Sequence, residues 1–153
     1  MKKLIAPLLL LSWLLTACST TPKLPPADFS QPGWNVRQAQ AVWTPKRGGP
    51  EIAGEVLIAR HDDKRAFVQF SKTPFPILVA QTTPKRWEIT FIPEQRTFGG
   101  GGRPWPRFSW LYLAPALQGE KLPEKLRFNP TGTEGWRLEN RSTGEVIEGF
   151  FLP

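Results

Sequence analysis

Trp87-Glu88-Ile89-Thr90-Phe91-Ile92 is the stretch that decides the fold, because its first five residues alternate strictly between apolar and polar side chains. In an extended strand, successive side chains point to opposite faces, so the first, third and fifth residues share one face. Alternation of this kind is typical of an antiparallel sheet with one face buried and the other in water. We therefore expect a strand here whose aromatic and aliphatic face packs on a core.

The same pattern recurs on both sides of this stretch, in short apolar segments separated by proline, glycine and charged residues. Such segments predict antiparallel strands joined by hairpins, for example across Ser142-Thr143-Gly144. We expect strands at Trp34–Trp43, Glu51–Arg60, Ala66–Ser71, Pro76–Gln81, Trp87–Ile92, Leu126–Phe128, Trp136–Asn140 and Glu145–Phe151. The sequence thus predicts a mainly β fold, a curved antiparallel sheet (half-barrel) of about seven strands.

Two segments in the middle of the chain depart from the alternation. Thr97–Gly102 ends in four consecutive glycines and predicts a flexible loop, which would serve as a mobile lid or a spacer. Arg107–Gln118 places apolar residues at helix-like spacing and predicts one short helix. We expect Pro115 to kink or end that helix.

His61 is the only histidine of the chain. With Asp62 and Asp63 beside it, the residue could be read as a catalytic base or part of a metal site. Neighbouring residues of a turn point apart, however, so we interpret His61–Lys64 as a solvated hairpin turn. We predict no metal site.

Other signals for catalysis are equally poor. The glycine run lacks the Gly-Lys-Ser/Thr ending of a phosphate loop, and the chain contains no Gly-x-Ser-x-Gly elbow. Four glutamates that could form a carboxylate pair fall at hairpin positions, where we expect them to face solvent: Glu134, Glu139, Glu145 and Glu148. We therefore predict no catalytic residues, no cofactor and no enzymatic activity.

The amino terminus predicts export. Lys2 and Lys3 precede an apolar run of 12 residues, Leu4–Leu15, which is followed by small residues and the only cysteine, Cys18. This is the pattern of a secretory signal peptide over residues 1–17, and the run is shorter than the roughly 20 residues that a membrane-spanning helix needs.

Leu15-Thr16-Ala17-Cys18 resembles the lipobox of bacterial lipoproteins. The resemblance implies that Cys18 is acylated, with fatty chains such as palmitate, and becomes the first residue of the mature protein. Two or three acyl chains would anchor the domain stably to a membrane that it does not span. Ser19, which is not Asp, implies by the same resemblance the outer membrane, with the domain facing the periplasm.

The mature chain divides into a tether and one domain. Residues 18–33 are rich in proline and poor in apolar residues, which predicts a lipidated, extended tether without a fold of its own. Residues 34–153 form the single β domain. Loss of Lys2 and Lys3 lowers the formal net charge from +7 to about +5, which favours anionic partners such as phospholipid headgroups. We do not expect an exported lipoprotein to bind nucleic acid.

Phe70–Ala80, a short turn and Trp87–Gln95 resemble in pattern the central part of LolA/LolB-like half-barrel proteins. In that family a curved antiparallel sheet, closed on one side by helices, holds lipoprotein acyl chains. The resemblance implies an apolar pocket for an acyl chain or a lipidated protein, with these candidate lining residues: Val56, Ile58, Val79, Trp87, Ile89, Phe91, Trp110 and Leu111. The family's acceptor-type members carry a leucine in a loop between central strands, whereas the matching turn, Thr82–Arg86, has none.

Two functions follow as alternatives. The first is a membrane-anchored lipoprotein that binds lipid or lipoprotein acyl chains in envelope biogenesis. The second is a non-enzymatic structural or assembly lipoprotein that binds an envelope protein through a sheet edge or an aromatic patch. An open cavity under the sheet would favour the first, and a solid core with exposed tryptophan would favour the second.

Overall fold

The computed structural model describes residues 23–153, which form one open antiparallel sheet of nine strands and one short helical segment. The predicted signal peptide and Cys18 lie outside the described residues. The strands are β1 (Trp34–Thr44), β2 (Ile52–His61), β3 (Ala66–Lys72), β4 (Phe75–Thr82), β5 (Arg86–Phe91), β6 (Arg96–Gly101), β7 (Leu126–Thr131), β8 (Gly135–Asn140) and β9 (Val146–Phe151). The predicted fold class is confirmed, with nine strands where about seven were expected.

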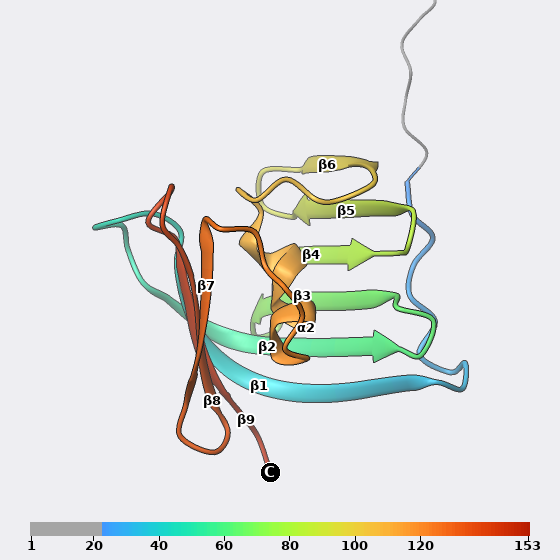
Figure 1. The fold of residues 1–153 in the computed structure, drawn as a ribbon, viewed down its shortest axis with the longest axis horizontal. Helices are drawn as coiled ribbons and strands as arrows, with labels where there is room; N and C mark the ends of the chain where they lie inside the picture. Colours follow the sequence, from blue (N-terminus) through green and yellow to red (C-terminus); the bar gives the residue numbers. More distant parts are fainter. Residues whose placement is uncertain (1–22) are drawn as a thin grey trace, which may run out of the picture.

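The strand order is β6-β5-β4-β3-β2-β1-β9-β8-β7, so all neighbours but one are consecutive in sequence. The exception is β1, which pairs with β9 through residues 39–44 and 146–151. Figure 1 shows β7, β8 and β9 running across the direction of β2–β6, with α2 between these two parts of the sheet. The sheet is therefore strongly bent around the helical segment.

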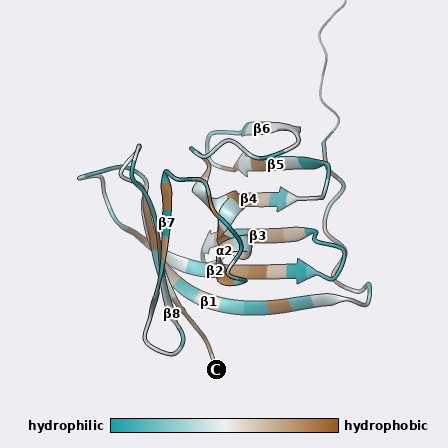
Figure 2. Ribbon diagram, in the orientation of Figure 1, coloured by the Kyte–Doolittle hydropathy of each residue, from teal (hydrophilic) through white to brown (hydrophobic). Residues whose placement is uncertain are grey.

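The core lies between the helical segment and one face of the sheet, which we call the inner face. Hydrophobic and hydrophilic residues alternate along β1 (Figure 2), and the buried ones, such as Ala39, Ala41 and Trp43, belong to the core cluster. The strand predicted from Trp87–Ile92 behaves in the same way, since Trp87 and Ile89 are buried. Their neighbours Glu88 and Thr90 lie on the opposite, outer face.

The glycine run is a strand and not a loop, which corrects the prediction for Thr97–Gly102. β6 pairs with β5 in the register Trp87↔Gly100 and Ile89↔Phe98. A Cβ atom on Gly100 would lie 3.2 Å from the indole ring of Trp87, so the large ring covers the bare backbone of the edge strand. Glycine here permits close approach of a bulky neighbour, a use of strand glycine that the sequence run alone does not reveal.

The predicted helix is present but shorter than Arg107–Gln118. It consists of the 3₁₀ turn η2 (Ser109–Tyr112) and the helix α2 (Leu113–Leu117). Pro115 lies in the first turn of α2, a position at which proline is tolerated, and the helix continues beyond it to Leu117. Gly119 ends it: φ is +71°, and the N–H groups of Gly119 and Glu120 donate to the carbonyls of Ala116 and Pro115.

The described part of the tether, residues 23–33, packs against the sheet, contrary to the prediction of an unfolded segment. The Leu24 N–H donates to Glu88 Oε2 at 3.0 Å, and the Phe29 ring packs on Phe67 and Trp34 at centroid distances of 5.1 and 5.3 Å. Figure 1 shows this segment passing along the ends of β5, β4, β3 and β2 before β1 begins. One aromatic ring and a few backbone hydrogen bonds therefore dock a segment whose composition predicts disorder.

Candidate functional site

The predicted acyl-chain pocket falls on the inner face, where most of its residues are core residues. Six of the eight are at most 6% exposed and belong to one hydrophobic cluster: Val56, Ile58, Trp87, Ile89, Trp110 and Leu111. Phe91 is half-buried and packs against this cluster.

Val79 is the member that the structure places elsewhere. It pairs with Gln69 and Thr90, whose side chains share the outer face, while Leu78 and Ala80 point into the core. Ile77 to Ala80 are all apolar, so this segment carries no alternation from which the side of Val79 could be read.

Aromatic rings occupy the space between the sheet and the helical segment. The Trp110 ring lies 5.1 Å from Phe70 and 5.7 Å from Trp43, and the Trp87 ring lies 5.7 Å from Phe108. Trp105, by contrast, is 53% exposed beside Trp87. The protein's own side chains thus fill the region that was expected to hold an acyl chain.

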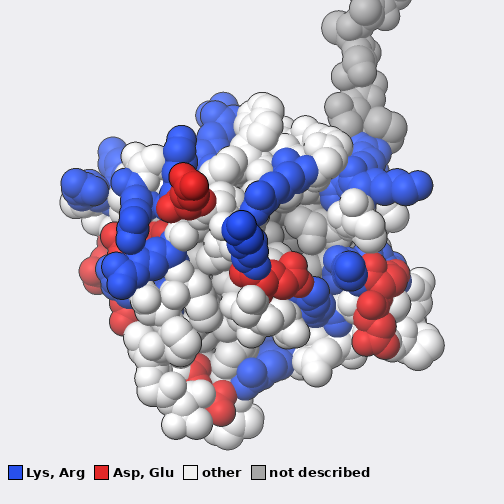
Figure 3. Space-filling model, viewed as in Figure 1, with Lys and Arg blue, Asp and Glu red and all other residues white. Residues whose placement is uncertain are grey.

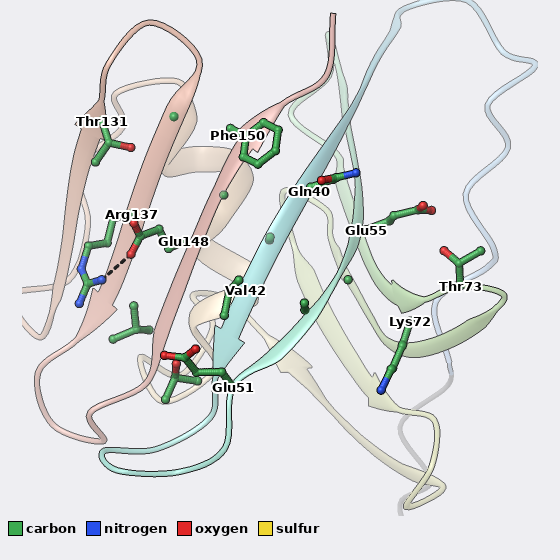
Figure 4. Close-up of a pocket in the computed structure, with 17 residues that line it drawn as sticks. Gln40, Val42, Glu51, Glu55, Lys72, Thr73, Thr131, Arg137, Glu148 and Phe150 are labelled. Atoms are coloured by element: carbon green, nitrogen blue, oxygen red, sulfur yellow. Dashed lines mark hydrogen bonds and ion pairs between the residues drawn. The ribbon is translucent and has the colours of Figure 1, made fainter.

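A groove of about 950 Å³ lies on the outer face, where β2, β1, β9 and β8 run side by side (Figure 4). Its floor includes the backbone of Gly54 and Gly149. A Cβ atom on Gly54 would lie 2.8 Å from the Phe70 ring, and one on Gly149 would lie 2.6 Å from Trp136. Each glycine therefore lets a core ring press directly against the backbone from the inner face.

The groove combines apolar and acidic groups. Val42 is 38% and Phe150 50% exposed, a high exposure for large apolar side chains on a sheet face. Glu51 and Glu55 line the groove, and within residues 23–153 neither carboxylate takes part in a hydrogen bond or an ion pair.

The other charged groups of the groove are one ion pair and one lysine. Glu148 accepts a hydrogen bond from Arg137 at 2.6 Å, and these two charges offset each other. Lys72, at the β3–β4 turn, has no acidic partner in the described chain. The groove thus has a small acidic excess in a chain whose formal net charge is +7.

Sequence reasoning missed this groove. Val42 and Phe150 stand at outward-pointing positions of strands whose inward positions are also apolar. That departure from simple alternation is the one signal in the sequence, and it is weak, because isolated exposed apolar residues are common. Nothing in the sequence indicates that β9 pairs with β1, the pairing that places β9 and β8 in the same sheet as β2.

Glu145 is buried, contrary to the prediction that the hairpin glutamates face solvent. Its carboxylate accepts hydrogen bonds from Trp43 Nε1 at 2.8 Å and Ser109 Oγ at 2.5 Å. Burial raises the pKa of this carboxyl group, and the bonds from Ser109 and Trp43 oppose that shift. Asn140 completes the network by donating to Ser109 Oγ and to the Pro106 carbonyl.

The Glu145 network joins the β8–β9 hairpin to the start of η2. Ser109 and Asn140 are fully buried, and no histidine lies among these residues. The Ser109 hydroxyl donates to the Glu145 carboxylate, but because it is fully buried it is out of reach of a substrate. We assign the network a structural role. Of the other three glutamates, Glu134 and Glu148 are exposed and Glu139 is half-buried.

His61 is not the solvated turn residue that the sequence predicted. Its side chain is only 14% exposed, its Nε2 donates to the Pro32 carbonyl at 2.9 Å, and its ring lies 5.1 Å from that of Trp34. The residue thus holds the end of the docked segment. In the described part of the chain, no three His, Cys, Asp or Glu side chains gather in a way that could hold a metal ion.

No protein-family model matches the chain, and no curated protein matches it either. Within residues 23–153, no helix is both long and apolar enough to span a membrane.

Proposed function

We propose that the chain is a membrane-anchored, non-enzymatic lipoprotein that binds a segment of an envelope protein in the outer groove. The observation that carries this proposal is the groove of about 950 Å³, in which two unpaired carboxylates lie near exposed apolar side chains. Concave sites with a few placed polar groups are where ligands usually bind.

The charges of the groove define the partner's chemistry. Glu51 and Glu55 have no partner within the described chain, so a cation brought to them gains ion pairs without breaking others. Because Val42 and Phe150 are exposed nearby, an apolar side chain would be desolvated at the same time. The best partner is therefore a segment that carries Lys or Arg together with apolar residues.

The dimensions suit an extended segment. The groove spans four neighbouring strands, whose spacing of ~4.8 Å makes it roughly 15 Å wide. An extended chain advances about 3.3 Å per residue, so a segment of about five residues crosses it. Contacts of this size bind weakly in solution, but anchoring both partners at one membrane raises their effective concentration.

The packed inner face favours this proposal over the acyl-chain alternative. Binding of an acyl chain among Ile89, Trp110 and Phe70 would require those buried side chains to move apart, and a packed core resists such expansion. Acyl-chain binding remains the alternative outcome of the experiments below. A titration with an acyl-chain fluorophore that saturates at one molecule per chain would support it.

Photocrosslinking in cells tests the groove directly. A photoreactive amino acid at Val42 should give a discrete crosslinked product, whereas the same residue at Ile92 should not. The two positions are matched, because Val42 is 38% and Ile92 39% exposed, and only Val42 lines the groove. Mass spectrometry of the product should identify a basic and apolar segment.

Substitutions in the groove then supply the second arm. Glu51→Gln with Glu55→Gln should abolish the crosslink from Val42, whereas Glu124→Gln with Glu94→Gln, which lie away from the groove, should leave it unchanged. Equal crosslinking from Val42 and Ile92, or a product that persists in the groove variant, would refute the proposal.

The anchor is tested separately. Cys18→Ala should prevent incorporation of a clickable palmitate analogue and should release the protein from membranes or leave it as the unprocessed precursor. Unchanged fractionation and processing of this variant would contradict the proposed acylation.

A further inference from the structure

We propose that one end of the sheet lies on the membrane and binds the anionic headgroups of its lipids. This end, which we call the basic end, carries the β2–β3 and β4–β5 turns and the exposed residues Lys23, Lys64, Lys85, Arg103 and Lys121. The inference rests on the proposed acylation of Cys18 and adds to it an orientation and a lipid-binding surface.

The docked segment determines which end meets the membrane. Residues 24–33 are bound to the sheet at both ends, through Leu24 to Glu88 and through the Pro32 and Gly33 carbonyls to His61 and Asp62. Only the chain between Cys18 and Leu24 remains to connect the anchor to the domain. Fully extended, it covers about 20 Å, whereas the whole tether of residues 18–33 would have covered about 50 Å.

The first held residue lies at the basic end. Leu24 contacts Glu88, which is two residues from the start of β5, and Figure 3 shows Lys and Arg side chains next to the point at which the described chain begins. The register places the turns together, because Thr82 pairs with Ala66 and Arg86 pairs with Gly101. The basic residues of these turns are therefore those that a short tether holds near the lipid.

The charges of this end are available to a ligand. Within the described chain, the side chains of Lys23, Lys64, Lys85 and Lys121 form no ion pair, and Arg103 donates to the Lys121 carbonyl and lies against the Tyr112 hydroxyl, both neutral groups. Most acidic groups nearby are already engaged. Asp63 forms an ion pair with Arg65, and Glu120 forms one with Arg60. The Glu88 carboxylate accepts a hydrogen bond from the Leu24 N–H, and the Asp28 carboxylate accepts one from the Ser30 N–H. Asp62 alone has a free carboxylate.

A hollow of about 200 Å³ at this end is lined by cationic side chains and is large enough for a headgroup phosphate. Lys64, Arg103 and Lys121 line it together with Tyr112 and the Arg60–Glu120 pair. The volume is several times the ~30 Å³ that one water molecule occupies in the liquid, so a phosphate group fits. Lys and Arg near an anionic leaflet are attracted to it over a Debye length of about 8 Å at physiological salt.

Fluorescence quenching in vesicles tests the orientation. Two variants of the acylated mature protein each carry one fluorophore. In Pro84→Cys it lies on the β4–β5 turn at the basic end, and in Lys46→Cys it lies just after β1, at the opposite end of the sheet. Each variant is reconstituted into vesicles that contain a headgroup-labelled quencher lipid. In phosphatidylcholine with about 30% phosphatidylglycerol, quenching at position 84 should be several-fold stronger than at position 46. The difference should shrink in pure phosphatidylcholine and at high salt.

Charge removal supplies the matched control. Lys64→Gln with Lys85→Gln and Lys121→Gln should reduce the difference in quenching between positions 84 and 46 to the difference seen in pure phosphatidylcholine. Lys125→Gln with Arg127→Gln and Arg141→Gln removes the same charge elsewhere on the surface and should leave the quenching at both positions unchanged. A vesicle-flotation assay reports the anchor independently. Flotation with equal quenching at both positions would overturn this inference alone, whereas failure to float would overturn it together with the proposed anchor.

Discussion

The two faces of the sheet differ in what they bury. The inner face presents a continuous set of apolar and aromatic side chains to η2 and α2, and sheet residues such as Leu138 and Ile147 are fully buried there. The outer face is mostly polar, with apolar side chains at the docking site of residues 23–33 and in the groove that contains Phe150. Stability therefore resides on one face and the candidate sites on or beside the other.

Because the core and the candidate sites lie on different faces, the concave side of this sheet is not the place to look for a ligand. The concave side of such a sheet is the expected position for a ligand, yet here it holds the helical segment and the core rings. The charged groups without partners lie on the outer face and at the sheet's end, where a change of side chain costs little stability. Substitutions on the two sides should consequently separate stability from binding.

Ile89→Ala should give the largest effect, because the side chain is fully buried on the inner face. Loss of transfer energy and the remaining cavity predict a decrease of about 2–5 kcal/mol in the free energy of unfolding. Urea denaturation followed by tryptophan fluorescence measures it. Val79→Ala on the outer face serves as the comparison and should cost less than about 1 kcal/mol. Similar small losses in both variants would indicate an open pocket under the sheet.

Glu145→Ala should cost about 1–3 kcal/mol, because it leaves the buried donors of Trp43 and Ser109 without their acceptor. Glu145→Gln retains an oxygen for one of them and should cost less. The raised pKa of Glu145 means that folding favours its protonated form. Its contribution to stability is therefore fully present below the pKa of the unfolded chain and is lost as the pH rises through the folded-state pKa.

The pH dependence provides the control for this residue. Wild-type stability, measured relative to Glu145→Gln, should fall as the pH rises from about 4 to neutrality. Thermal melts at several pH values give this difference. A relative stability that rises over the same range would show that the carboxylate is favoured in the folded state and would contradict the shift.

Phe29→Ala should have a smaller effect of about 1 kcal/mol, because the ring is partly exposed but packs edge-on against Phe67 and Trp34. Its main consequence should be local. Hydrogen exchange should become faster in residues 23–33 while the core amides keep their protection. Exchange in this segment that is already fast in the wild type would show that the segment is not docked.

Glu51→Gln with Glu55→Gln should have the smallest effect on stability, within about 0.5 kcal/mol, because neither carboxylate has a partner among residues 23–153. Denaturation curves of the variant and the wild type should overlay, which makes this variant suitable for the crosslinking experiment. A marked loss of stability would show that the groove carboxylates already take part in the fold.

Alternation in the sequence was sufficient to predict the strands and their inner faces wherever polar residues interrupt the apolar ones. β5 is the clearest case, with Trp87 and Ile89 buried and Glu88 directed outward. The same alternation failed to place Val79, where four apolar residues follow one another, and failed to reveal β6, where the glycines have no side chains that could alternate. Both failures arise because period two is visible only through a contrast between side chains.

The candidate sites could be predicted only in part. The basic character of the chain follows from composition, but the gathering of Lys64 and Lys85 at one end depends on the strand register. Lys121 joins them through the loop that follows α2. The burial of Glu145 depends on η2 crossing the β8–β9 hairpin, with Ser109 and Asn140 at hydrogen-bonding distance in the network. Interactions between segments about 30 residues apart leave no local pattern in the sequence.

The pairing of β1 with β9 has a consequence for how the protein is made. Residues 39–44 are held on one side by the adjacent β2 but on the other by residues 146–151, near the end of the sequence. During synthesis from the amino terminus, the β2–β6 hairpins can form early, whereas one edge of β1 stays unpaired until β9 has been made. Until then that edge offers free N–H and C=O groups to other chains. Premature termination before β9 would leave it permanently open, so such fragments should aggregate rather than accumulate as a smaller soluble domain.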